Sequence, residues 1–153
     1  MPAVEALLDR AERLCRERGL KLTPMRRRVL EILAGARNPL SATGLIAAIG
    51  EEARKPVSPI LVYRALDFLG EAGLIHRLAA RNAYVPCEGE HPADAATVFL
   101  LCAQCGGAHE VASREVERGL EGSATAAGFK PLARTIEVEG ECATCRAGGS
   151  GER

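Results

Sequence analysis

The spacing of apolar residues in the first half of the chain predicts four helices. Apolar residues recur there every three or four positions, which places them on one buried face of a helix. The four stretches begin at Val4, Pro24, Ala42 and Pro59. A serine or threonine precedes each of the last three and can cap it, and proline suits the first helical position. We expect Gly19, Gly50 and Gly73 to end the first, third and fourth helices.

A short β-hairpin is predicted directly after the fourth helix. Residues 74–78 and 83–85 have the length and composition of strands, and residues 80–82 between them form a turn. Helices followed by a hairpin are the order of elements in a winged helix-turn-helix, whose second motif helix enters the major groove of DNA. The first half therefore predicts a DNA-binding domain over residues 1–86.

The fourth helix has two different faces. The apolar face consists of Val62, Ala65, Leu66 and Leu69. The opposite face carries Ile60, Arg64 and Asp67, with Tyr63 beside them. Because arginine can bind guanine O6 and N7 together and an apolar side chain can contact a thymine methyl group, this face suits DNA reading. The alternative is an ordinary surface helix in which Arg64 contacts Asp67 or Phe68.

Basic residues elsewhere in the first half are candidates for phosphate contacts. Arg26, Arg27 and Arg28 follow the start of the second helix, and Arg77 and Arg81 lie in the hairpin. Arginine is a common ligand of DNA phosphate, so all five positions suit that role. For the triplet in the second helix, a solvated charged face is an equal alternative.

The chain as a whole has no net charge, but its two halves differ. Residues 1–86 hold 14 Lys and Arg against 9 Asp and Glu, a net charge of +5. Residues 87–153 hold 6 against 11, a net charge of −5, so the first half is the one suited to phosphate. No apolar run approaches the ~18 residues of a membrane span, and the N-terminus lacks the pattern of a signal peptide. We therefore expect a cytoplasmic protein with reduced thiols and no membrane partner.

The second half predicts a small α/β domain over residues 97–146, which makes the fold class α+β. Strands are expected at residues 98–101, 108–112 and 135–139, with a helix from Ser113 to about residue 127. Residues 87–96 are rich in acid and proline and form a hinge or linker between the domains. Residues 147–153 are expected to be a disordered tail.

Four cysteines in two pairs supply the chemistry of the second half. They are Cys102 and Cys105, then Cys142 and Cys145. Two residues between cysteines let both sulfurs of a tight turn bind one ion, and two such turns provide the four-cysteine set of a structural zinc site. The metal would join the two ends of the small domain. The alternatives are two disulfides or four free thiols.

Together these motifs resemble the ferric uptake regulator superfamily, and most of all its zinc uptake regulator branch. The stretch 62–66 (Val-Tyr-Arg-Ala-Leu) with Gly73-Leu74-Ile75-His76 resembles the reading helix and wing. Glu110, Gly128-Phe129 and the two cysteine pairs resemble the dimerisation domain. The resemblance covers about residues 20–145 and implies a homodimeric, zinc-responsive transcriptional repressor. Leu61 departs from the threonine usual in the family, which removes a possible phosphate contact.

The resemblance also implies a second, regulatory zinc in the hinge, and so two zinc ions per monomer. The matching positions are His76, Cys87, His91 and Glu110. Imidazole, thiolate and carboxylate together suit tetrahedral zinc, and the thiolate disfavours the rival reading as a sensor of iron, manganese or peroxide. His109 is the alternative to His91, although in a strand it faces away from Glu110.

The mechanism implied for such a protein links the hinge metal to DNA binding. Zinc bound between the domains would fix their angle, and in a twofold dimer that angle sets the spacing of two reading helices on a palindromic operator in double-stranded DNA. We expect no catalytic residues, because no Ser/His/Asp set, carboxylate pair or phosphate-binding loop stands out. A thiol–disulfide protein using C-x-x-C is the rival from another class, but it lacks the βαβ context of a thioredoxin-like fold.

Overall fold

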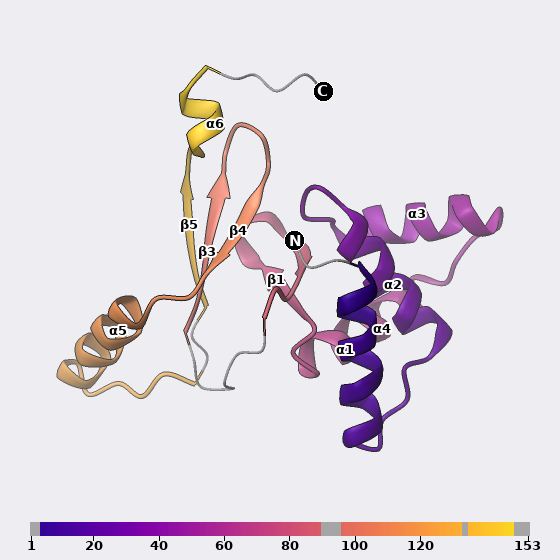
Figure 1. The fold of residues 1–153 in the computed structure, drawn as a ribbon, viewed down its shortest axis with the longest axis horizontal. Coiled ribbons are helices and arrows are strands. Elements are labelled where there is room, and N and C mark those ends of the chain that lie inside the picture. The colour runs from indigo at the N-terminus through magenta and orange to yellow at the C-terminus, as the bar shows by residue number, and fades with distance from the viewer. Residues whose placement is uncertain (1–3, 90–95, 133–134, 149–153) are drawn as a thin grey trace. The chain divides into compact units, whose positions relative to one another are not determined.

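The computed structural model describes residues 4–89, 96–132 and 135–148, which fall into two units. The first unit is Met1–Glu88 and the second is Gly89–Arg153. Within the described residues, the first unit contains four α-helices and a hairpin, and the second contains a three-stranded sheet and two α-helices (Figure 1). This order of helix and sheet confirms the predicted α+β class, with a winged-helix unit followed by a small α/β unit.

The helices of the first unit begin where the sequence predicts. They are α1 (Val4–Glu17), α2 (Pro24–Gly35), α3 (Ala42–Ala53) and α4 (Pro59–Glu71). The Thr23 side chain accepts a hydrogen bond from the amide of Arg26 and caps α2. Ser41 caps α3 in the same way through the amide of Gly44. Ser58 makes no such bond, so the proline after it is the signal that marks the start of α4.

The prediction that Gly50 ends the third helix is wrong. The helix continues to Ala53, and Arg54 follows it in a left-handed conformation with a φ of 51°. A glycine inside a helix costs only about 1 kcal/mol relative to alanine, and the helix-favouring residues after it outweigh that cost. Gly19 and Gly73 do follow α1 and α4, with φ angles of 65° and 73°.

The apolar faces of the four helices form the core of the first unit. The buried face of α4 is the predicted one and consists of Val62, Ala65, Leu66 and Leu69. Buried residues of α1, α2 and α3 join the same core, as does Ile75 from the hairpin. The core therefore fixes which side of α4 remains exposed.

The hairpin consists of two antiparallel strands. These are β1 (Ile75–Leu78) and β2 (Ala83–Pro86), joined by the short 3-10 turn η1 (Ala79–Arg81). His76 lies opposite Val85 in the register. Leu40, just before α3, exchanges two backbone hydrogen bonds with Tyr84, of 3.1 and 2.8 Å. The hairpin is thus tied to the helical part of the first unit by backbone bonds as well as by its connection to α4.

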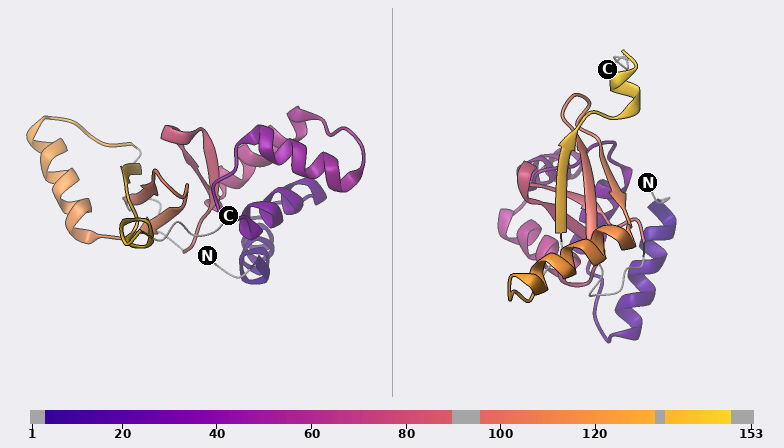
Figure 2. Two further views of the ribbon diagram at one scale, coloured as in Figure 1. Left: turned by 90° about the horizontal axis from the view of Figure 1, so that it is seen from above. Right: turned by 90° about the vertical axis from the view of Figure 1, so that its left-hand side faces the viewer.

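The second unit is built on a mixed sheet. Its strands are β3 (Thr97–Cys102), β4 (Ala108–Val111) and β5 (Thr135–Gly140), in the order β4-β3-β5 (Figure 2). β3 pairs with β4 antiparallel and with β5 parallel, and a parallel pair needs a crossover, which contains α5 (Arg114–Ala126). Because Cys102 lies opposite Gly140, the two cysteine pairs meet at the same end of the sheet. The short helix α6 (Ala143–Arg146) starts there and was not predicted.

Much of the apolar surface of the second unit is exposed in the single chain. None of the residues of α5 is buried. Large exposed apolar side chains in this unit are Leu100, Val111, Val116, Phe129, Leu132 and Val138. Among the described residues, no helix combines the length and the apolar character that crossing a membrane requires.

Candidate metal centre and DNA-binding surface

Four cysteine thiols converge at one end of the sheet in the second unit. The Sγ atoms of Cys102, Cys105, Cys142 and Cys145 all lie within 4.8 Å of one another. Those of Cys105 and Cys142 are 4.0 Å apart, almost twice the ~2.05 Å of a disulfide bond. Four sulfurs bound tetrahedrally to zinc at about 2.3 Å lie about 3.8 Å from each other. None of the four cysteines forms a disulfide, so the cluster fits a four-cysteine zinc site and does not fit paired disulfides.

Hydrogen bonds in and between the two cysteine turns hold this arrangement. The amide of Gly106 donates to the carbonyl of Cys102 at 3.1 Å, and Gly106 has a φ of 76°, which favours glycine. The Gln104 side chain donates to the Glu141 carboxylate at 2.7 Å and joins the first turn to the second. These contacts involve protein groups alone, so they hold both turns in shape independently of a bound ion.

The thiols in the cluster differ in acidity. Hydrogen bonds from backbone amides, that of Cys105 first among them, lower the pKa of Cys102 to about 6. The amide of Cys142 contributes and lies 3.4 Å from the Cys102 sulfur. The neighbouring Cys142 thiol and burial raise the pKa of Cys145 to about 12. The Cys102 thiol therefore ionises readily, whereas the neighbouring thiols oppose ionisation of Cys145. A divalent cation would stabilise the negative charge of the full set.

Two of the predicted ligands of the second metal lie together in the first unit. His76 is in β1 and Cys87 directly follows β2, and their ligand atoms lie within 4.8 Å of each other. Antiparallel pairing brings them together, because His76 faces Val85, two residues before Cys87. Cys87 is 2% exposed, so its thiol is shielded from solvent.

The other predicted ligands belong to the second unit. Glu110 and His109 are neighbours in β4 and point to opposite faces, as residues in a strand do. His109 is exposed and lines a cavity of about 400 Å³ with Leu100 and Val138, whereas Glu110 is half-buried. His91 lies outside the described residues, so its role stays a prediction.

The predicted reading face of α4 is exposed. Ile60 is 62% exposed and Tyr63 is 47% exposed, and Arg64 is exposed between the buried positions. Within the part of the chain that the structure describes, no hydrogen bond or ion pair engages the Arg64 side chain, so the alternative contacts with Asp67 and Phe68 are not made. Arg64 is therefore available to a ligand.

The other predicted DNA contacts have protein partners. The Arg26 guanidinium carbon lies 3.6 Å from the centre of the Phe68 ring. The Arg77 side chain donates to the Asn82 side chain at 2.9 Å, within the hairpin. Such contacts orient the two arginines and leave other donors of each guanidinium available.

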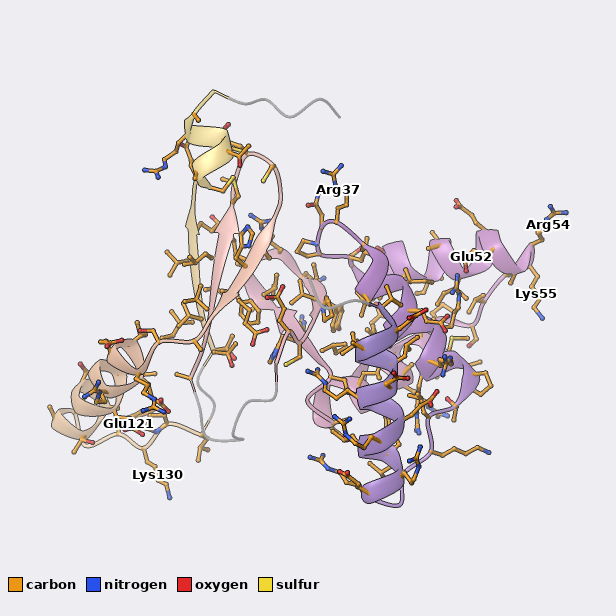
Figure 3. The ribbon with its side chains drawn as sticks, in the orientation of Figure 1. Arg37, Glu52, Arg54, Lys55, Glu121 and Lys130 are labelled. Atoms are coloured by element: carbon orange, nitrogen blue, oxygen red, sulfur yellow. The ribbon has the colours of Figure 1, made fainter. Side chains whose placement is uncertain are left out.

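The remaining arginines of the triplet join helices to each other. Arg27 bonds to Glu12 of α1 and to Glu31 of its own helix. Arg28 bonds to Glu31 and to a residue of α3, Glu52. Glu52 is labelled in Figure 3. Both arginines are thus neutralised by carboxylates, which favours a role between helices over a phosphate contact.

A winged helix with an exposed reading face, joined to an α/β unit with a four-cysteine cluster, defines a class of metal-dependent DNA-binding proteins. The model of the ferric uptake regulator family matches residues 17–139. The chain belongs to the ferric uptake regulator family.

Similar proteins support this membership. The zinc uptake regulation protein of Escherichia coli (strain K12) is 35% identical over 142 residues, which cover 92% of this chain and 82% of that protein. A solved zinc uptake regulator in complex with zinc and DNA is 32% identical, with a TM-score of 0.88 over 96% of this chain and 97% of that one. The holo form of XcZur is 42% identical, with a TM-score of 0.79 over 93% of this chain and 98% of that one.

Proposed function

We propose that this protein is a zinc-responsive transcriptional repressor that binds DNA and controls genes of zinc uptake. The observation that carries the proposal is the second thiol site, in which Cys87 lies beside His76 in the winged-helix unit. Thiolate and imidazole favour zinc over ions that prefer oxygen ligands. Two of the similar proteins named above are a zinc uptake regulation protein and a zinc uptake regulator, and the family consists of transcription regulators rather than enzymes.

The regulatory site in this proposal combines residues of both units. His76 and Cys87 come from the first unit, and Glu110 and His91 come from the second. Together they offer two imidazoles, one thiolate and one carboxylate, a donor set that suits a tetrahedral zinc ion. With the four-cysteine site, each monomer would bind two zinc ions.

Ligands from both units give this site its control over DNA binding. A bound ion supplies a link of fixed length between the first unit and the second, so their angle becomes restricted. The reading faces of α4 in two subunits then take up one spacing, which must match the two half-sites of a palindromic operator. Zinc favours the DNA-binding form only by the amount that its affinity for that form exceeds its affinity for the others.

The proposed active form is a homodimer held by the second unit. Its support is the exposed apolar surface of that unit, which includes Leu100 and Val138 on adjacent strands, 44% and 47% exposed. Phe129 and Leu132 are 69% and 94% exposed. A second copy that covers such side chains removes them from water, which favours association.

A Cys87→Ser variant tests the proposed function. The probe is a duplex enriched from a random pool by the zinc-loaded wild-type protein. We expect the variant to stay folded and dimeric with its structural zinc, because the four-cysteine cluster is untouched, and to lose the second zinc and specific DNA binding. Weak, salt-sensitive binding by the basic first unit should remain.

The matched control is Cys15→Ala, since Cys15 is a buried thiol of α1 outside both groups of ligands. It should keep both zinc ions and bind the selected duplex. A Cys87→Ser protein that holds one zinc per monomer and still binds this duplex with wild-type affinity would reject the proposed site. Metal analysis of the purified wild-type protein separates zinc from iron or manganese.

A further inference from the structure

Cys87 is held at both of its backbone polar groups. Its amide donates to the carbonyl of Leu74 at 2.9 Å. Its carbonyl accepts a hydrogen bond of 2.9 Å from the Nη2 atom of Arg10, a residue 77 positions earlier in α1. Cys87 is 2% exposed and Leu74 is fully buried, so both bonds lie where water competes poorly for these groups.

Arg10 reaches this carbonyl from a helix that is itself fixed. Its neighbours Leu7 and Ala11 on α1 are buried in the core of the first unit, at 1% and 0% exposure. An ion pair from Glu12 to Arg27 ties α1 to α2 close by. The backbone that carries Arg10 is therefore held in place by the core and by this ion pair.

We infer that Arg10 is a positioning residue for the regulatory metal site. The inference rests on the proposed function, in which Cys87 is a ligand. By fixing the Cys87 carbonyl, Arg10 limits the rotation of the backbone that carries the thiol and keeps that thiol beside His76. A ligand pair that is already in place loses less conformational freedom when it binds an ion, so affinity rises.

The chemistry of arginine suits this task. Its planar guanidinium presents several donors in a rigid fork, which can hold a carbonyl oxygen in one position. A hydrogen bond from a charged donor is also stronger than one from a neutral donor. Partners that hydrogen-bond to metal-ligating side chains typically change metal affinity by roughly 10- to 100-fold when they are removed, which gives the scale for a partner that orients a ligand through its backbone.

The decisive variant is Arg10→Met, which keeps the apolar stem and removes every donor. Arg16→Met is the matched control, because Arg16 is an exposed arginine of the same helix and its loss changes the net charge equally. Arg10→Lys retains the charge and a donor. Arg10→Gln stays polar but is too short to reach the carbonyl, and it replaces Arg10→Met if that variant does not fold.

Two measurements are made on the full-length dimer with its structural zinc in place. The first is the affinity for the second zinc, by competition with a chelator of known affinity. The second is hydrogen exchange of the Cys87 amide before the second zinc is added. We expect Arg10→Met or Arg10→Gln to lower the affinity by about 10-fold or more and to speed exchange at Cys87 but not in the core of α2.

Arg10→Lys should recover part of the affinity, and Arg16→Met should match the wild type. Wild-type affinity in Arg10→Met, or an equal loss in Arg16→Met, would overturn the inference. Cys87→Ser separates this failure from that of the proposed function. If Cys87→Ser loses the second zinc while Arg10→Met keeps it, only the role of Arg10 is wrong. If Cys87→Ser keeps the second zinc, the proposed site itself is wrong.

Discussion

The three arginines at the start of α2 depend on their neighbours for their roles. Arg26 stacks on the ring of Phe68, and its charge stays near the surface that also carries α4. Arg27 and Arg28 bond to carboxylates, and these hydrogen bonds raise the pKa of both guanidinium groups. A charge that is already paired gains less from a phosphate. Arg64, on the exposed face of α4, is therefore the better candidate for contact with a base.

Arg64→Ala tests the reading face. If Arg64 binds a base edge, the change should weaken binding to the selected duplex by about 1–3 kcal/mol per half-site and relax the sequence preference, as measured by footprinting titrations. If Arg64 touches only phosphate, binding should weaken evenly across sequences with a shallower salt slope. Lys130→Ala removes an equal charge from the second unit and is the control. Unchanged specific binding by Arg64→Ala would reject α4 as the reader.

The sequence predicts the four-cysteine cluster because two C-x-x-C motifs carry its chemistry. The hinge ligands His76 and Cys87 are implied by the family resemblance, and the predicted hairpin is compatible with their approach. The contact between Arg10 and the Cys87 carbonyl carries no such signal, because it joins a surface arginine to a backbone atom 77 positions away. Contacts of that kind depend on how α1 packs, which spacing alone does not determine.

At the scale of single elements, local signals predict starts better than ends. Caps mark the starts of α2 and α3 because a side-chain oxygen accepts from an amide that the helix leaves unpaired. Proline marks the starts of α2 and α4 because it has no amide hydrogen to leave unpaired. The prediction that the third helix ends at Gly50 is wrong, because glycine permits a left-handed turn without requiring one. The α6 helix is missed because four residues hold too little periodicity. The bridge between Leu40 and Tyr84 pairs segments that are distant in sequence.

Two glycines near the end of α4 test how the effect of glycine depends on its backbone conformation. Gly70 lies inside the helix, and a Cβ atom there would meet nothing within 4 Å. Gly70→Ala should therefore raise the free energy of unfolding of the first unit by about 0.5–1 kcal/mol. Gly73 has a φ of 73°, so Gly73→Ala should lower that free energy by about 1 kcal/mol. Urea unfolding followed by circular dichroism measures both, and shifts in the same direction would contradict this account of α4.

At the scale of the whole molecule, the two units carry different functional features. The first unit carries the positive charge, the exposed reading face and the His76–Cys87 pair. The second carries the four-cysteine cluster and the exposed apolar surface proposed to form the homodimer. A structural zinc in that cluster would contribute to the folding of the second unit directly, because the unfolded chain has no preformed site and the free energy of zinc binding adds to that of folding. Loss of the proposed hinge zinc, in contrast, should leave both units folded.

In the proposed function, one zinc ion stabilises the fold and another controls DNA binding. The most direct test counts zinc per monomer in the wild-type protein before and after mild chelation, and measures affinity for the selected duplex in both states at one salt concentration. We predict that chelation removes one of two zinc ions, leaves a folded dimer and abolishes specific binding, which returns when zinc is added. A chelated protein with one zinc per monomer and unchanged affinity for this duplex would contradict the account.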